Sequence, residues 1–346
     1  MKKGILFVIL IFLLVRPVSA MEFTAPSVPE SGEAFMPAQT ESFAEGLWYV
    51  IKSAISQIQP SVAEAAKICL SLIAIVLLVS VLNTFSGAPH RIVELVSTVT
   101  ISMLLLQPSN ALIRLGVQTV EELSEYGKLL LPVMTAAMAA QGGVTTSAAL
   151  YSGTALFNAL LSSVVSKLIV PMLYIYLCLS VVNSAIGEEI LKNLRSFVKW
   201  LMTWCLKLVL YVFTGYIGIT GVVSGSADAA AVKAAKLTIS GVVPVVGGIL
   251  SDASETILVS AGVMKSAVGV YGLLAMLAVW IGPFIQIGVQ YLLLKITAAV
   301  CSVFGVKHGE TIIQDFSGAL GFLLAMTGTV CLLLLVSTVC FMKGVA

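Results

Sequence analysis

Charged residues are scarce in this sequence. Asp, Glu, Lys and Arg make up 10% of its 346 residues, whereas about a quarter of a soluble domain is charged. Two histidines are too few for a metal-rich or triad-based site, and no P-loop, HExxH or GxSxG signature occurs. No basic stripe is present that would bind nucleic acid. These absences argue against an enzyme, a metalloprotein or a nucleic-acid-binding protein, and we expect no cofactor and no metal.

Long apolar runs dominate the sequence instead, and hydrophobic residues make up 59% of it. The run Ile68–Phe85 contains no acidic or basic residue. As a helix it would rise about 27 Å, which is close to the hydrocarbon thickness of a bilayer. Backbone amides inside lipid must be satisfied within their own segment, so such spans form helices. We therefore predict an all-α fold, a polytopic transmembrane helical bundle of about seven to ten spans.

Three regions are predicted along the chain. Residues 1–20 are typical of a signal peptide, because a basic start is followed by a short apolar stretch and small residues at a cleavage site. An uncleaved signal anchor is the alternative. Residues 21–67 are predicted to form an extracytoplasmic acidic arm, mostly disordered, and then an amphipathic lead-in. Residues 68–346 are predicted to form the polytopic membrane domain.

Proline and glycine are expected to divide the membrane domain into short pieces. Pro108 is predicted to stop a helix, after which Ser109–Lys128 is an amphipathic segment. The stretch Leu129–Ile186 is predicted to hold three apolar pieces, because Gln141-Gly142-Gly143 and Pro171 interrupt it.

The basic residues predict which ends of the spans face the cytoplasm. The segments 86–91, 187–207 and 295–315 contain basic residues, and we place all three on the cytoplasmic side. The segment 187–207 is amphipathic, with one apolar and one basic face. The apolar face repeats through Ile190, Leu191, Leu194, Phe197, Val198, Leu201 and Cys205, and the basic face holds Lys192, Arg195 and Lys199.

An internal repeat with an offset of 112 residues is a further hypothesis. Two pairs of prolines share this offset, namely Pro132 with Pro244 and Pro171 with Pro283. The copies would cover 129–225 and 241–342 and would be parallel, as in some transporters. The alternative is that two apolar stretches share residues by chance.

The densest polar constellation lies at 240–256. Its candidate structural or pore residues are Gly241, Pro244, Gly247, Gly248, Ser251, Asp252 and Glu255. One interpretation is a helix start, with Asp252 as the cap and Glu255 closing a capping box. A second is a broken membrane segment whose free backbone groups or carboxylates line an aqueous path. A third is an acid/base pair, for which the sequence shows no partner base or metal ligand.

Three ionisable residues are candidate intramembrane polar groups: Glu94, Lys167 and Lys265. Charges within a membrane are functional candidates by default. Glu94 and Lys167 lie near predicted helix ends, where snorkelling explains them equally well. The six cysteines are scattered singly, so we interpret them as packing residues rather than as disulfide partners or metal ligands.

Two stretches resemble a known family. They are SGVVPVVGGILSDASETIL at Ser240–Leu258 and GPFIQIGVQYLLLKITAAVCSVFG at Gly282–Gly305. Together with the signal peptide, the acidic arm and the polytopic body, they resemble the stage III sporulation protein AE family. The resemblance covers most of the chain from Leu47 onward. It implies a multi-pass protein of the mother-cell membrane around the forespore, with a role in endospore formation.

The resemblance also implies partners. Members belong to the AA–AH assembly of stage III sporulation A-operon membrane proteins, which joins the forespore stage II Q protein and is thought to form a secretion-like channel. That assembly contains an ATPase, protein AA, which agrees with the missing P-loop here. The resemblance implies no catalytic residue.

We therefore expect a non-enzymatic, multi-pass membrane subunit of a sporulation channel complex. One alternative is a secondary transporter whose site is the broken segment 240–255. Another is a purely structural membrane scaffold that never lines a pore. An intramembrane enzyme is the least favoured hypothesis, since no nucleophile–base pair is visible in the sequence.

Overall fold

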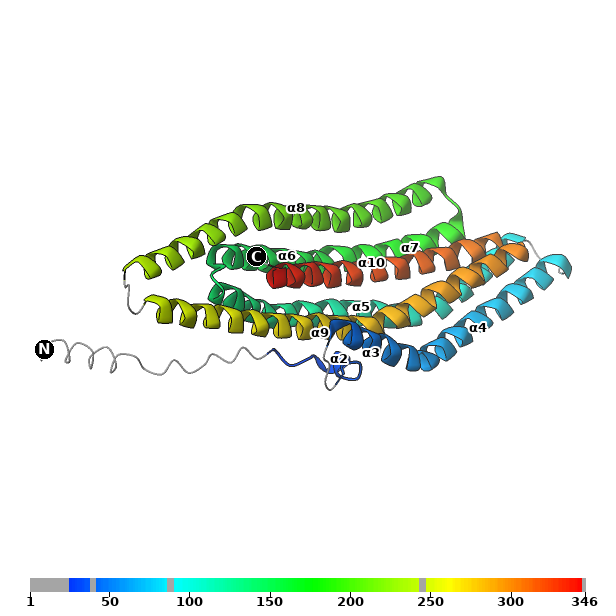
Figure 1. Ribbon diagram of the computed structural model, residues 1–346. Helices are drawn as coiled ribbons and strands as arrows, with labels where there is room; N and C mark the ends of the chain where they lie inside the picture. The colour runs from blue at the N-terminus through cyan, green and yellow to red at the C-terminus, as the bar shows by residue number, and fades with distance from the viewer. Residues whose placement is uncertain (1–24, 38–41, 86–89, 243–246, 344–346) are drawn as a thin grey trace, which may run out of the picture.

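The chain folds into a bundle of long antiparallel helices (Figure 1). The computed structural model describes residues 25–37, 42–85, 90–242 and 247–343, with the side chains of 90, 91, 221–242, 247–261 and 264 excepted. The predicted signal peptide lies outside the described residues. No strand occurs in the described ranges, which confirms the all-α prediction.

The elements are α2 (Glu30–Glu33), α3 (Phe43–Ser56), α4 (Ile58–Phe85), α5 (His90–Ala140), α6 (Val144–Val164), η1 (Val165–Ile169), α7 (Val170–Ile186), α8 (Glu189–Val242), α9 (Gly247–Val303) and α10 (Lys307–Lys343).

Six helical stretches of the described chain are long and apolar enough to cross a membrane. They are α4, α5, the continuous rod of α6, η1 and α7, the first part of α8, the second part of α9, and α10. The polytopic helical class is therefore confirmed, with fewer separate helices than the seven to ten spans that we expected. With 57 residues, α9 is about 85 Å long, whereas the hydrocarbon core of a bilayer is about 30 Å thick. The bundle is accordingly much longer than one bilayer is thick.

Pro108 and Pro171, which were expected to divide the chain, lie within continuous helical stretches, as do Pro132 and Pro283, and this corrects the predicted breaks. Helix α5 continues through Pro108 and Pro132, and α9 continues through Pro283. Pro171 follows the π-helical turn η1, where the N–H of Val170 donates to the carbonyl oxygen of Val165. A wider turn of this kind lets the helix continue next to proline, which has no backbone N–H to donate. Between α5 and α8 the chain therefore runs along the bundle once, not three times.

Only one of the two predicted breaks in residues 129–186 is found. The chain turns at Gln141–Gly143, where Gly142 has a φ of 92° that favours glycine. The other sharp turns of this type lie at Gly187 and Gly305, with φ values of 78° and 73°. These two turns and the junction of α4 with α5 lie at the same end of the bundle (Figure 1). All three fall in segments that we expect on the cytoplasmic side, so the fold brings these segments together.

The 112-residue repeat stays a prediction. Both proposed copies contain a long helix, a turn at a left-handed glycine, and another long helix. The first copy also turns at Gly142, whereas residues 247–303 of the second copy form one helix.

Helix α10 lies at the centre of the bundle, although it is the last helix of the chain. Its side chains Phe316, Met326 and Val330 are fully or almost fully buried. More than half of the apolar stretch of α9 and of α10 is buried, against a third or less in the other four candidate spans. The core is therefore built on α9 and α10, and the remaining long helices surround them.

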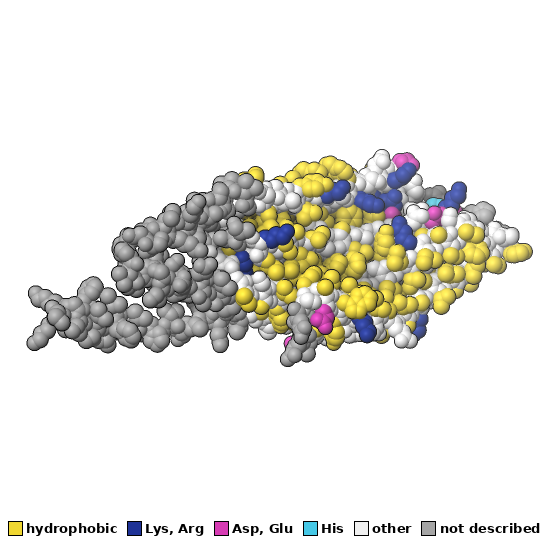
Figure 2. Space-filling model, in the orientation of Figure 1, with side chains coloured by type: hydrophobic (Ala, Val, Ile, Leu, Met, Phe, Trp, Pro, Cys, Tyr) yellow, Lys and Arg dark blue, Asp and Glu magenta, His cyan; other side chains and the backbone are white. Residues whose placement is uncertain are grey.

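The outer surface is largely apolar, as a lipid-facing bundle requires. Hydrophobic side chains cover much of the described part of the face in Figure 2. In helix α8, part of the apolar face that was predicted for residues 187–207 points outward, toward the lipid-facing surface. Ile190 is 77% exposed, and Phe197, Trp200 and Trp204 stack along the outer surface. Helix α8 instead buries Val198 and Met202, and it turns Arg195 inward.

The N-terminal arm is packed against the bundle in its described part, so the expectation of a mostly disordered arm is wrong for these residues. Helix α3 buries Val50 against Leu274 and Ala278 of α9. Upstream, a Cβ on Gly32 would stand only 2.8 Å from a methyl carbon of Val279. Apolar residues between the glutamates therefore dock the arm on α9, an effect that its acidic composition conceals.

Candidate functional site

The strongest candidate site is a buried charge pair between α8 and α10. The guanidinium of Arg195 donates a short hydrogen bond from Nη1 to Oδ2 of Asp315. The two side chains are only 15% and 12% exposed. Tyr176 of α7 donates from its hydroxyl to the other carboxylate oxygen of Asp315, at 3.3 Å. Three helices therefore meet at one carboxylate, and α10 is far in sequence from the consecutive helices α7 and α8.

A second polar contact ties the start of α10 to α7 and α5. Nδ1 of His308 lies 2.9 Å from the carbonyl oxygen of Ser184. Because a carbonyl oxygen can only accept, Nδ1 carries the proton in this contact. Nε2 of His308 then faces Oε2 of Glu94 at 3.6 Å. Both side chains are partly exposed, so this contact lies nearer the surface than the Arg195–Asp315 pair.

The arrangement of these groups supports a structural role rather than chemistry. The charge of Arg195 is balanced by Asp315, and both oxygens of that carboxylate are occupied. Two charges removed from water are costly unless geometry and additional hydrogen bonds compensate them. Among the described residues, no group of three His, Cys, Asp or Glu side chains could hold a metal ion. The network can therefore hold α7, α8 and α10 in one register.

The predicted constellation at 240–256 lies at the junction of α8 and α9. Gly241 belongs to the end of α8, Pro244 lies outside the described residues, and α9 begins at Gly247. Gly248, Ser251, Asp252 and Glu255 lie along the first turns of α9, and their side chains are not described. Asp252 is five residues after Gly247, where α9 begins, and the capping and acid/base interpretations stay predictions. The pore interpretation stays a prediction.

The three predicted intramembrane charges lie on three different elements. Glu94 of α5 faces His308, as described above. Lys167 is exposed on the π-helical turn η1. Lys265 of α9 is buried, with 4% of its surface exposed. Of these candidates, Glu94 contacts the start of α10 through His308.

Sequence reasoning missed the Arg195–Asp315 pair. It placed Arg195 on a basic face opposite the apolar face, and it assigned Asp315 only to the cytoplasmic segment 295–315. A signal was present in the predicted topology, because both residues lie in segments assigned to the same end of the bundle. An acidic residue that becomes buried at the start of an apolar span is costly unless a cation pairs with it.

The chain is similar in sequence to known proteins. A family model described as stage III sporulation protein AE matches residues 34–344. A protein of Bacillus subtilis (strain 168) named stage III sporulation protein AE is 22% identical over 256 residues. This match covers 74% of the present chain and 63% of the relative, so the chain spans less than two thirds of that relative's length. No solved structure matches the chain.

Proposed function

We propose that this chain, which belongs to the stage III sporulation protein AE family, is a non-enzymatic membrane subunit of a channel or secretion-like complex that links mother cell and forespore. The observation that carries the proposal is the family match, which extends over almost the whole described chain. Six long apolar helices support a membrane location. Membership of the family supports a sporulation-related membrane protein, and the channel role is the proposed refinement.

The proposed location is the mother-cell membrane around the forespore. The proposed partners are the other stage III sporulation A-operon membrane proteins, including their ATPase subunit, and indirectly the forespore stage II Q protein. The buried polar network supports a division of labour in which this chain supplies helix walls and contacts. Its buried charges Arg195 and Asp315 are paired with each other, and energy-consuming chemistry would come from the ATPase.

The proposal is tested by deletion of the gene in its own host during sporulation. We expect few heat-resistant spores, a normal yield after complementation, and co-purification of the tagged chain with the ATPase subunit from sporulating cells. A normal spore yield after deletion would refute the sporulation role. A low yield without co-purification of any partner membrane protein would refute the complex and leave a role in sporulation.

A secondary transporter is the second candidate function. The buried Lys265 favours it, because an ionisable group inside a membrane helix is costly to retain without a role. Lys265→Met should abolish sporulation at normal protein level if this lysine serves transport. A normal spore yield from that variant would count against the transporter and leave the subunit proposal intact.

A further inference from the structure

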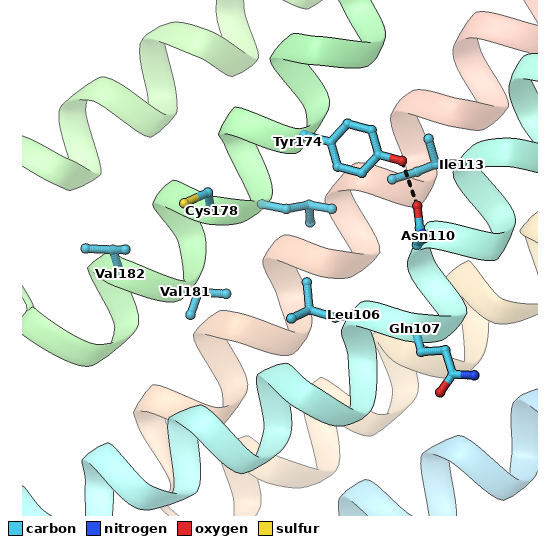
Figure 3. A pocket seen from close by; sticks show the side chains of 9 residues that line it. Leu106, Gln107, Asn110, Ile113, Tyr174, Cys178, Val181 and Val182 are labelled. Carbon is cyan, nitrogen blue, oxygen red and sulfur yellow. Dashed lines mark hydrogen bonds between the residues drawn. The ribbon is translucent and has the colours of Figure 1, made fainter.

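Two hollows flank the exposed face of α5 near the middle of the helix. One is a cavity of about 620 Å³ between α5 and α7, with apolar walls that include Ile113, Leu177 and Val181 (Figure 3). The other is a hollow of about 520 Å³ between α5 and α9, whose walls are partly polar and include Arg114 and Gln286 beside Leu112 and Leu115. Gln107 and Asn110 line both hollows. An apolar and a polar compartment therefore adjoin at one place on the surface.

A hydrogen bond fixes the boundary between the two compartments. The hydroxyl of Tyr174 donates to Oδ1 of Asn110 at 2.7 Å, which joins α7 to α5 (Figure 3). Because the amide oxygen of Asn110 is occupied, its NH₂ group stays available as a donor. Gln107 is exposed beside it and offers a second amide. Gln118 already donates to Glu122 and is not counted as a donor to a ligand.

Arg114 supplies a positive charge at this boundary. It is exposed, and among the described residues it forms no ion pair with a carboxylate. It lies in the middle of a 51-residue helix rather than at a helix end. A guanidinium binds planar or phosphate oxygens through several N–H groups at once. The charge, the adjacent amide donors and the apolar cavity are together complementary to an anionic amphiphile.

We propose that these two hollows bind one anionic phospholipid. One acyl chain occupies the apolar cavity between α5 and α7, and the phosphate oxygens accept hydrogen bonds from Arg114 and Asn110. The volume of each hollow lies in the range of about 300–1,000 Å³ that is typical of small-molecule sites. A transmembrane helix of a partner would contact the surface over a much longer strip than these hollows provide. The site does not depend on the function proposed above.

The test is native mass spectrometry of the full chain in detergent with added phosphatidylglycerol or phosphatidylethanolamine. The wild type should retain one phosphatidylglycerol with a preference of about fivefold. Arg114→Gln should remove this preference, and Val181→Trp should reduce the retention of both lipids by filling the apolar cavity. Lys199→Gln on α8 is the control for charge, and Val212→Trp, on the exposed face of α8, is the control for added bulk. Both controls should behave as the wild type does.

Cys178 reports on the cavity itself. It is a free, exposed cysteine that lines the apolar cavity. Phosphatidylglycerol should slow its alkylation in the wild type and should not do so in Val181→Trp. Because Arg114 is exposed, Arg114→Gln should fold normally and keeps the test decisive if the tryptophan variant misfolds. Equal retention of the two lipids by the wild type, unchanged selectivity in Arg114→Gln, or cross-linking of Cys178 to a partner protein in place of lipid protection would overturn the proposal.

Discussion

Breaking the Arg195–Asp315 pair should destabilise the bundle strongly, whereas replacing both residues together should not. Asp315→Leu leaves Arg195 as an uncompensated charge, and Arg195→Met leaves the carboxylate of Asp315 in the same position. Removal of one partner from a buried pair costs about 3–5 kcal/mol. The residual exposure of 15% and 12% places the expected loss near the lower limit, about 3 kcal/mol for each single variant.

The double variant Arg195→Met with Asp315→Leu removes the charges and their desolvation together. We expect its stability to lie within about 1 kcal/mol of the wild type, because apolar replacement of a buried pair is often neutral. The coupling free energy between the two positions should then be large and favourable. Tyr176→Phe removes one hydrogen bond to Asp315 and should cost about 1 kcal/mol.

The assay is reversible unfolding of the purified chain in mixed micelles, evaluated as a double-mutant cycle. Lys192→Gln is the matched control, because it breaks the exposed Lys192–Glu189 contact at 3.3 Å. An exposed pair contributes only about 0–1 kcal/mol. Single variants at Arg195 and Asp315 that cost no more than this control would refute the argument that burial makes the pair essential.

Three further predictions concern packing and turns. Gly153→Ala should cost about 1–3 kcal/mol, because its Cβ would lie 1.9 Å from the ring of Tyr216, whose hydroxyl is bound to Ala149. Gly215→Ala, with no atom within 4 Å, is the control in the same unfolding assay and should not destabilise. Gly187→Ala and Gly305→Ala should each lower the free energy of unfolding by about 1–2 kcal/mol, since both glycines have positive φ. Melting temperatures equal to that of the wild type would contradict this. Met326→Ala in central α10 should cost about 2–5 kcal/mol, and Leu332→Ala, 52% exposed on the same helix, should cost much less in detergent; equal losses would argue against a central α10.

The helical class follows from composition alone, but the side chains that join the helices do not. The long apolar runs predict spans because lipid leaves the backbone no other partner. The pair of Arg195 and Asp315 depends on which faces of α8 and α10 meet, which is a property of the packed bundle. The amphipathic pattern of 187–207 was misleading for the same reason. In water the apolar face of such a helix turns inward, whereas in lipid Ile190 and Trp200 can remain outside while Arg195 finds its partner inside.

The failure of the proline rule has a related cause. In a soluble helix, Pro108 or Pro283 would remove a hydrogen bond that water could replace in a turn. Inside lipid a turn would expose several unpaired backbone groups, while a continuous helix leaves only the carbonyl opposite the proline unsatisfied. The continuous helix is therefore the less costly choice, as α5 and α9 show. Three of the helix ends in the described part of the chain have a glycine with a positive φ, at Gly142, Gly187 and Gly305. At these three described turns a left-handed glycine, rather than a proline, marks the end of the helix.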